Sequence, residues 1–153
     1  MLDELQGFIK VNRLSAQIFE VRGEVHSAAH AAAEMDNEPD KVAKSIVLVD
    51  SNKSPVLVIL LGKDRVDFQK LKKILNVSDV RLAEPYEVLE MTGFEVGGVP
   101  PVSIYGIRTI IDKSAAEKEE IVCGGGDVRH LMRIKVKEIL ENVEDVEVAD
   151  VKK

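Results

Sequence analysis

Lys44 lies in an otherwise apolar run, KVAKSIVLVD, where a lysine is either a side chain that snorkels from a strand edge or a charge directed into a cleft. Two loops add backbone groups that could approach a ligand. FEVGGVPPVS (94–103) combines two glycines with two prolines, so its backbone is stiff and its amides are accessible. CGGGDVRH (123–130) has three consecutive glycines, then Asp127 and His130. Taken alone, each loop is more commonly a tight turn between strands; the joint occurrence of both loops with Lys44 narrows the possible functions.

Other groups that could do chemistry are sparse. His26 and His30 have the i, i+4 spacing of metal ligands, but no glutamate follows His26 and no third ligand accompanies the pair, which leaves capping and packing as the simpler interpretation. Cys123 lies in an apolar run, where a free cysteine is usually a small buried hydrophobe. Phosphate-binding loops, dinucleotide-binding glycine motifs and serine-hydrolase elbows are missing, which argues against those three chemistries. We therefore predict no metal and no cofactor.

The elements that must position these groups follow from apolar periodicity and turn residues. Helices are predicted for the opening residues up to Asn12 and for 27–36, 65–75, 84–93 and 137–143. Strands are predicted for 17–25, 41–50, 55–62, 79–83, 108–114, 120–126, 130–136 and 146–151, with a hairpin at SNKS (51–54) and a linker at NEPD (37–40). This order predicts an α/β fold in which helices surround a mixed β-sheet or a partly closed barrel.

Composition limits the function further. The 153 residues, 45% of them hydrophobic and 31% charged, are typical of one soluble globular domain spanning 1–153. A single cysteine fits a reducing cytoplasm, and no apolar run approaches the ~20 residues that cross a bilayer. The net charge of −6 argues against broad binding of duplex DNA but permits contact with an RNA end.

At this point the sequence resembles the YbaK/ProX-type aminoacyl-tRNA deacylases, which are related to the editing domain of bacterial prolyl-tRNA synthetases. The segments that carry the resemblance run nearly from end to end: SAAHAAAEM, KVAKSIVLVD, PVLVILLGKDRVDFQKL, MTGFEVGGVPPV, RTIIDKS and IVCGGGDVRHLMRI. The most specific segment is TGFEVGGVPP (92–101), which contains a glycine-x-x-x-proline loop at 97–101. The resemblance implies the fold of that editing domain and a hydrolase that removes alanine or cysteine from mischarged tRNA, above all tRNA(Pro).

The resemblance also implies roles for individual residues. Lys44 would hold the phosphate of the terminal adenosine or the substrate carbonyl, the 97–101 loop would cradle the CCA end and present its amides to the ester, and Asp127 would help to close the pocket. Water would attack with help from the ribose 2′-hydroxyl. The expected catalytic residues are Lys44, Gly97, Gly98 and Asp127, and the expected substrate-binding residues are Val99, Pro100, Pro101, Gly125, Gly126 and His130.

The expected partners are the 3′ end of an aminoacyl-tRNA and a synthetase, such as prolyl-tRNA synthetase, that delivers it. The side chains that set the pocket size are expected among Ile46, Val99, Cys123 and Met132, with Met91 and Val42 as alternatives. Two other functions stay open from the sequence: a non-catalytic module that binds the tRNA acceptor end or a synthetase, and a small-molecule hydrolase of the same fold.

Overall fold

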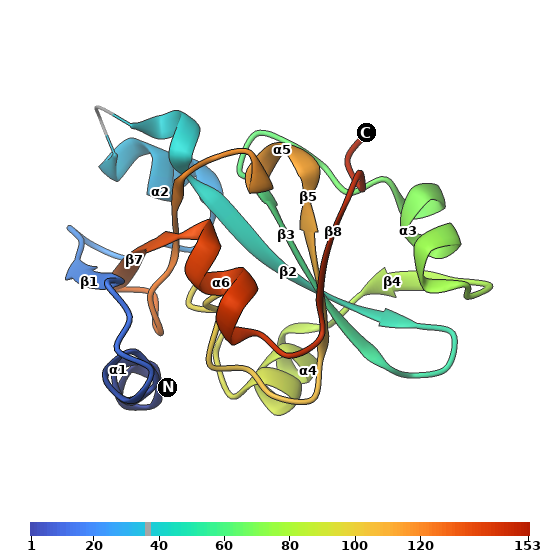
Figure 1. The fold of residues 1–153 in the computed structure, drawn as a ribbon, viewed down its shortest axis with the longest axis horizontal. Coiled ribbons are helices and arrows are strands. Elements are labelled where there is room, and N and C mark those ends of the chain that lie inside the picture. Colours follow the sequence, from blue (N-terminus) through green and yellow to red (C-terminus); the bar gives the residue numbers. More distant parts are fainter. Residues whose placement is uncertain (36–37) are drawn as a thin grey trace.

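The computed structural model describes residues 1–35 and 38–153 (Figure 1). Its helices are α1 (Leu2–Val11), α2 (Ala28–Glu34), α3 (Phe68–Leu75), α4 (Pro85–Thr92), α5 (Lys113–Ala116) and α6 (Val136–Asn142), with a 3₁₀ turn, η1 (Pro39–Lys41). Its strands are β1 (Gln17–Glu20), β2 (Ala43–Asp50), β3 (Pro55–Leu61), β4 (Val80–Leu82), β5 (Arg108–Asp112), β6 (Glu120–Gly124), β7 (His130–Lys135) and β8 (Val146–Ala149). Among the described residues no helix is long and apolar enough to cross a membrane.

The strands form two sheets. The larger has the order β4-β2-β3-β5-β8, and the smaller has the order β1-β7-β6. In the larger sheet β2 pairs antiparallel with β3 and β4, whereas β3–β5 and β5–β8 are parallel. A bridge between Val42 and Val122 joins the two sheets. The predicted α/β class with a mixed sheet is therefore confirmed, and the strands divide between two sheets.

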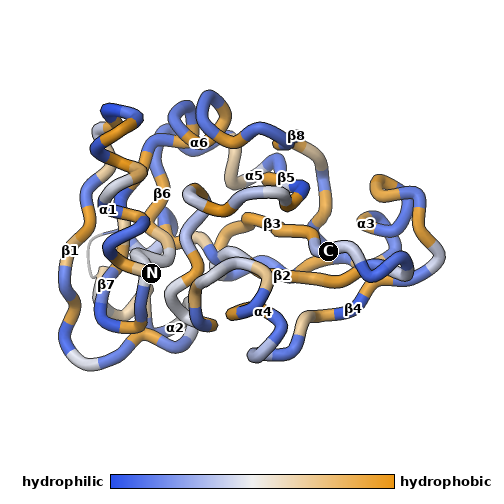
Figure 2. The backbone as a smooth tube through the Cα atoms, turned by 90° about the horizontal axis from the view of Figure 1, so that it is seen from below, coloured by the Kyte–Doolittle hydropathy of each residue, from blue (hydrophilic) through white to orange (hydrophobic). Residues whose placement is uncertain are grey.

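The β2–β3 hairpin forms because two apolar, β-branched runs flank a short polar loop. Its strands lie in the middle of the larger sheet, and Figure 2 shows hydrophobic residues along most of both. Side chains alternate between the two faces of β2. Val47 packs into the cluster shared with the smaller sheet, and Leu48 into the cluster beneath α3. Apolar clusters therefore pack against both faces of β2, the strand that carries Lys44.

Helix boundaries follow local capping chemistry. The side chain of Ser27 accepts a hydrogen bond from the His30 amide and begins α2, as predicted. Asp67 caps α3, which therefore begins after the predicted residue 65. Pro85 and Gly93 bound α4 as expected, with Gly93 in the left-handed region at φ 80°. Each cap satisfies amides or carbonyls that the helix itself leaves unpaired.

Other predicted boundaries also differ from the structure. The strand predicted for 17–25 ends at Glu20, because this residue pairs with His130, the first residue of β7. The strand predicted for 108–114 ends at Asp112, whose buried carboxylate caps α5 by accepting the Ser114 amide at 3.0 Å. Part of the predicted 37–40 linker forms η1, and residue 37 lies outside the described residues.

The C-terminal residues are tied to the segment that follows β3. The amide of Asp67 donates to the Val151 carbonyl at 2.7 Å, and the amide of Lys153 donates to the Arg65 carbonyl at 2.9 Å. The amide of Val151 donates to the Asp112 carboxylate at 3.0 Å. Residues 62–67, which follow the strand beside Lys44, are therefore fixed by residues at the other end of the sequence.

Candidate active site

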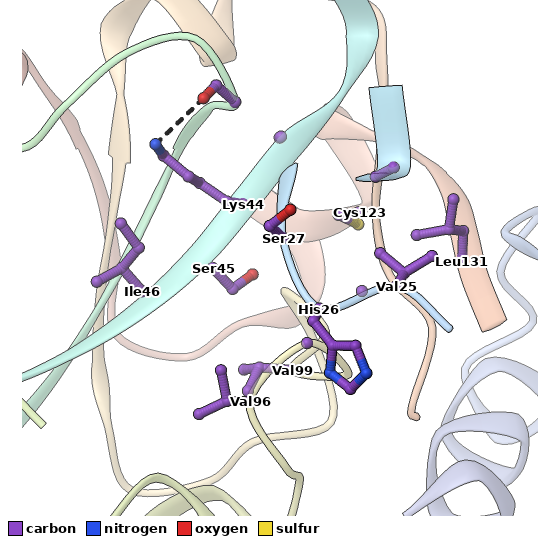
Figure 3. Close-up of a pocket in the computed structure, with 15 residues that line it drawn as sticks. Val25, His26, Ser27, Lys44, Ser45, Ile46, Val96, Val99, Cys123 and Leu131 are labelled. Atoms are coloured by element: carbon purple, nitrogen blue, oxygen red, sulfur yellow. Dashed lines mark hydrogen bonds between the residues drawn. The ribbon is translucent and has the colours of Figure 1, made fainter. Parts of the chain in front are cut away.

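A pocket of about 430 Å³ opens where the beginning of β2 approaches the smaller sheet (Figure 3). Segments far apart in the sequence form its wall: residues 25–27 before α2, the start of β2, the loop after α4, the end of β6 and the start of β7. Its apolar lining is Val25, Ala31, Ala43, Ile46, Val96, Val99, Cys123 and Leu131. The rest of the lining is His26, Ser27, Lys44, Ser45, Gly62, Gly97 and Gly124, so none of the lining residues is acidic.

Lys44 is the principal charge at this pocket. Its ammonium donates a hydrogen bond to the Gly62 carbonyl at 3.2 Å, and no carboxylate of the described residues lies within salt-bridge distance of it. Partial burial, reinforced by the positive charge of Arg65 and opposed by Asp64, lowers the pKa of Lys44. The site therefore holds a cation that lacks a carboxylate partner and can interact with an anionic group of a ligand.

The two glycine loops pack against each other through their backbones. A Cβ atom on Gly124 would lie 2.2 Å from the Val99 carbonyl oxygen, and one on Gly98 would lie 2.6 Å from the Cα of Asp127. Gly97 has φ +94°, and a Cβ there would lie 2.7 Å from the Val25 oxygen. Glycine is required at these positions by close approach, and at Gly97 by backbone conformation as well. The loops together form one rigid wall of the pocket.

Amides in this wall differ in whether they already have a partner. The Gly98 amide donates to the Glu95 carbonyl at 2.9 Å, and the Gly126 amide donates to the Gly98 carbonyl at 3.0 Å. The amides of Gly97 and Val99, two pocket-lining residues, make no hydrogen bond within the part of the chain that the structure describes. Of the loop amides expected to face a substrate, those of Gly97 and Val99 are thus available, whereas that of Gly98 is engaged.

Asp127 and His130 form a pair behind this wall. An oxygen of Asp127 lies 2.7 Å from Nδ1 of His130 and also accepts the Arg129 amide at 2.8 Å. Burial raises the pKa of Asp127, but these two hydrogen bonds outweigh it and leave the pKa below its ordinary value. The pair fixes the turn against which Gly98 packs, and neither side chain lines the pocket.

The structure brings together three of the ten predicted site residues: Lys44, Gly97 and Val99 line the pocket. Those that do not line it are Gly98, Pro100, Pro101, Gly125, Gly126, Asp127 and His130. Of the side chains expected to set the pocket size, Ile46, Val99 and Cys123 line it, whereas Met132, Met91 and Val42 do not. The catalytic and binding roles assigned to the ten residues stay predictions.

Several lining residues were not singled out as site residues. Ser45 had one available signal, its position beside Lys44 on a predicted strand, and its Oγ is buried without a hydrogen-bond partner among the described residues. His26 precedes α2, contacts Glu24 at 2.8 Å and borders the pocket. Val25 and Leu131 reach it only through the packing of β7 against the 21–28 segment, which has no local sequence signal.

Cys123 is placed as a packing residue. Its side chain is 1% exposed, and its Sγ lies 3.7 Å from the Met132 carbonyl oxygen. Burial raises the pKa of the thiol well above its usual range, so the thiolate needed for nucleophilic attack is disfavoured. Among residues 1–35 and 38–153 no group of three or more His, Cys, Asp or Glu side chains is arranged to hold a metal ion.

The chain is similar in sequence to a known protein family. Residues 22–141 match the aminoacyl-tRNA editing domain. Proline–tRNA ligase of Halalkalibacterium halodurans is 33% identical over 105 residues, which cover 69% of this chain and 18% of the ligase. Proline–tRNA ligase of Pediococcus pentosaceus is 30% identical over 118 residues, which cover 74% of this chain and 20% of that ligase. The chain thus spans about a fifth of the length of these curated relatives.

Solved structures are similar over almost the whole chain. The hypothetical protein APE2540 superposes with a TM-score of 0.89 at 28% identity, covering 98% of this chain and 99% of that one. A protein described as a candidate trans-editing enzyme for prolyl-tRNA synthetase superposes with a TM-score of 0.85 at 30% identity, and the match covers 99% of this chain and 96% of that one. These likenesses include both sheets and the elements that form the pocket.

Proposed function

We propose that this chain, which belongs to the aminoacyl-tRNA editing domain family, is a deacylase that hydrolyses the ester between a small amino acid and the 3′ end of tRNA. We assign alanine or cysteine as the amino acid and tRNA(Pro) as the carrier, and we treat residues 1–153 as one editing domain. The observation that carries the proposal is the Lys44 ammonium, which lacks a carboxylate partner among the described residues and borders a mostly apolar pocket of about 430 Å³.

The lining suggests how the ester would be held. Lys44 would bind the phosphate of the terminal adenosine, and the available amides of Gly97 and Val99 would donate to the oxyanion that forms at the ester carbonyl. One such donor contributes roughly 2.7–4 kcal/mol to transition-state stabilisation in hydrolases. Water would attack, oriented by the ribose 2′-hydroxyl of the substrate. The protein's part is then orientation and electrostatics.

Selection by size supports a small amino acid. Each methylene in an apolar pocket contributes only ~1–3 kcal/mol, so a synthetase site that fits proline cannot strongly exclude alanine or cysteine, and a second, smaller pocket is needed. Val99 and Cys123 border the pocket with fixed, buried side chains, which limits the space for a larger group. With a net charge of −6, the chain would bind tRNA weakly, which favours delivery by a synthetase.

A deacylation panel tests the proposal. The protein would be incubated at low salt with tRNA(Pro) carrying alanine, cysteine or proline, and with alanyl- and cysteinyl-tRNA carrying their correct amino acids. We expect selective hydrolysis of a mischarged tRNA(Pro), loss of at least 100-fold of the activity in Lys44→Ala, and full activity in Lys73→Ala, which changes an exposed lysine on α3. Binding of tRNA without hydrolysis of any ester would instead identify a non-catalytic module.

A further inference from the structure

The register of β2 leaves part of one edge open beside the pocket. In an antiparallel pair, the N–H and C=O of successive residues point alternately toward and away from the partner strand. The Val42 carbonyl accepts the Gly62 amide at 2.8 Å, and the Asp50 amide donates to the Ser54 carbonyl at 3.0 Å, so the even-numbered residues of β2 face β3. The odd-numbered residues, Ser45 among them, direct both groups to the opposite edge.

That opposite edge is covered on either side of Ser45 but not at Ser45 itself. Strand β4 pairs with residues 48–50, and the Ala83 amide reaches the Val47 carbonyl at 3.0 Å. At the other end the Val42–Val122 bridge joins β2 to β6. Among the described strands none pairs with this edge of β2 at Ser45, whose only strand partner is Ile59 of β3. One residue of a central strand therefore has no described strand beside it on this edge, where it borders a pocket.

A second observation indicates that a ligand completes this gap. The Ser45 Oγ is buried and has no partner among the described residues, and Figure 3 shows Ser45 and Lys44 pointing away from each other on opposite sides of β2. Buried backbone and hydroxyl groups are almost always hydrogen-bonded in folded proteins, because leaving one unpaired is costly. A buried hydroxyl without a partner, next to a strand edge that no described strand covers, is typical of a binding position.

The chemistry of an aminoacyl ester matches these groups. Its α-amino group needs an acceptor, and no carboxylate lines the pocket to supply one. A backbone carbonyl can fill that role. An aminoacyl group has the N–H donor and the C=O acceptor of one strand residue, in the same covalent order, so it can exchange both hydrogen bonds with a residue on a strand edge.

We propose, on the basis of the deacylase function above, that the aminoacyl group pairs with Ser45 as one residue of an added antiparallel strand. The α-amino group donates to the Ser45 carbonyl, and the ester carbonyl accepts from the Ser45 amide. The second lone pair of that oxygen is then left for one of the Gly97 and Val99 amides, and the third lone pair, which appears when the oxyanion forms, is left for the other. Because directly paired residues place their side chains on one face, the side chain of an L-amino acid lies on the face of Ser45. Val99 and Cys123 pack on that face together with Ala43.

The test compares three esters of tRNA(Pro) on the unmodified protein: alanyl, lactyl, in which a hydroxyl replaces the amino group, and isobutyryl, in which a methyl group replaces it. Each enzymatic rate is divided by the spontaneous rate of the same ester, which corrects for the different reactivities. We expect lactyl to stay within about threefold of alanyl, since its hydroxyl still donates, and isobutyryl to fall by about 10-fold to 100-fold. If the deacylation panel shows a preference for cysteine, the three esters compared are cysteinyl-tRNA(Pro) and its α-hydroxy and α-methyl analogues.

Ser45→Ala separates the backbone from the side chain. Whatever its effect on the rate, this variant retains the ratio of alanyl to isobutyryl hydrolysis if the Ser45 carbonyl is the acceptor. Loss of that ratio would assign the amino group to Oγ and overturn the pairing. Equal acceleration of all three esters would also overturn the pairing with Ser45, while leaving the deacylase function intact. If no ester of the deacylation panel or of this comparison is accelerated, both the pairing and the deacylase function are overturned.

Discussion

Gly124→Ala places a methyl group where the two halves of the pocket wall meet. The new Cβ would lie 2.2 Å from the Val99 carbonyl oxygen, about 0.8 Å inside the 3.0 Å below which real Cβ atoms are not found. The atoms that the new Cβ meets belong to the backbone of Gly98 and Val99. The clash can therefore be relieved only if β6 and the 97–101 loop separate by nearly an ångström. Overpacking of this kind costs about 1–3 kcal/mol of unfolding free energy. For a protein of this size the Tm would fall by about 2–12 °C.

The same shift displaces the Val99 and Gly97 amides relative to Lys44. A misplacement of about 1 Å can lower an enzymatic rate by roughly 100-fold, so we expect kcat/KM for the mischarged tRNA to fall to about 1%. Thermal unfolding and the deacylation panel measure the two effects on the same preparation. Gly7→Ala is the matched control: Gly7 lies within α1 with nothing within 4 Å of its new Cβ, and alanine there should stabilise by about 0.5–1 kcal/mol. An unchanged Tm and rate in Gly124→Ala would refute the close-packed wall.

Three further results are expected. Lys44→Met should raise the Tm by about 1–3 °C while it removes hydrolysis, because burial lowers the pKa of Lys44 and so its charged form opposes folding at neutral pH; a lower Tm would contradict this. Cys123 should resist alkylation at pH 8 in the native protein and react in urea, as read by mass spectrometry, since burial raises the pKa of its thiol. Arg133 lowers the pKa of Glu38 and Glu120, a contribution to stability that is present above pH 4.5 and lost as the pH falls below it. Arg133→Gln should therefore reduce the Tm at pH 7, with a difference that shrinks toward pH 3.

Much of the fold could be predicted from the sequence because its signals are local. The β2–β3 hairpin follows from two β-branched runs around SNKS. Helix α4 follows from Pro85 at its first position and Gly93 directly after its last. The division into two sheets had no such signal, since it depends on β1 pairing with residues that lie 110 to 116 positions later in the sequence. The α5 turn was missed because it depends on the buried Asp112 carboxylate, which also holds Val151.

The site was less accessible to prediction than the fold. Lys44 stands out in an apolar strand, and the composition of the 97–101 loop marks it as a close-approach segment. Which residues of the loop line the pocket was not predictable, because Gly98 faces Asp127 whereas Gly97 and Val99 border the pocket. Ser45 was missed for a related reason: its importance comes from where β4 stops, which is a property of strand register and not of residue type.

The ties between the C-terminal residues and the segment after β3 have a consequence during translation. The turn that contains Gly62 is synthesised about 90 residues before Val151 and Lys153, the residues whose backbone holds its neighbours Asp67 and Arg65. At ~5–20 residues per second, a ribosome needs roughly 5–18 s to add them. Strand β5, which covers the outer edge of β3, is synthesised about 50 residues after β3, and β8 follows only near the end. The hairpin therefore first exists with an unpaired hydrophobic edge on the nascent chain. Substitutions at Asp112 or Val151 should therefore act first on the yield of folded protein in the cell, and only then on the deacylation rate proposed for the folded protein.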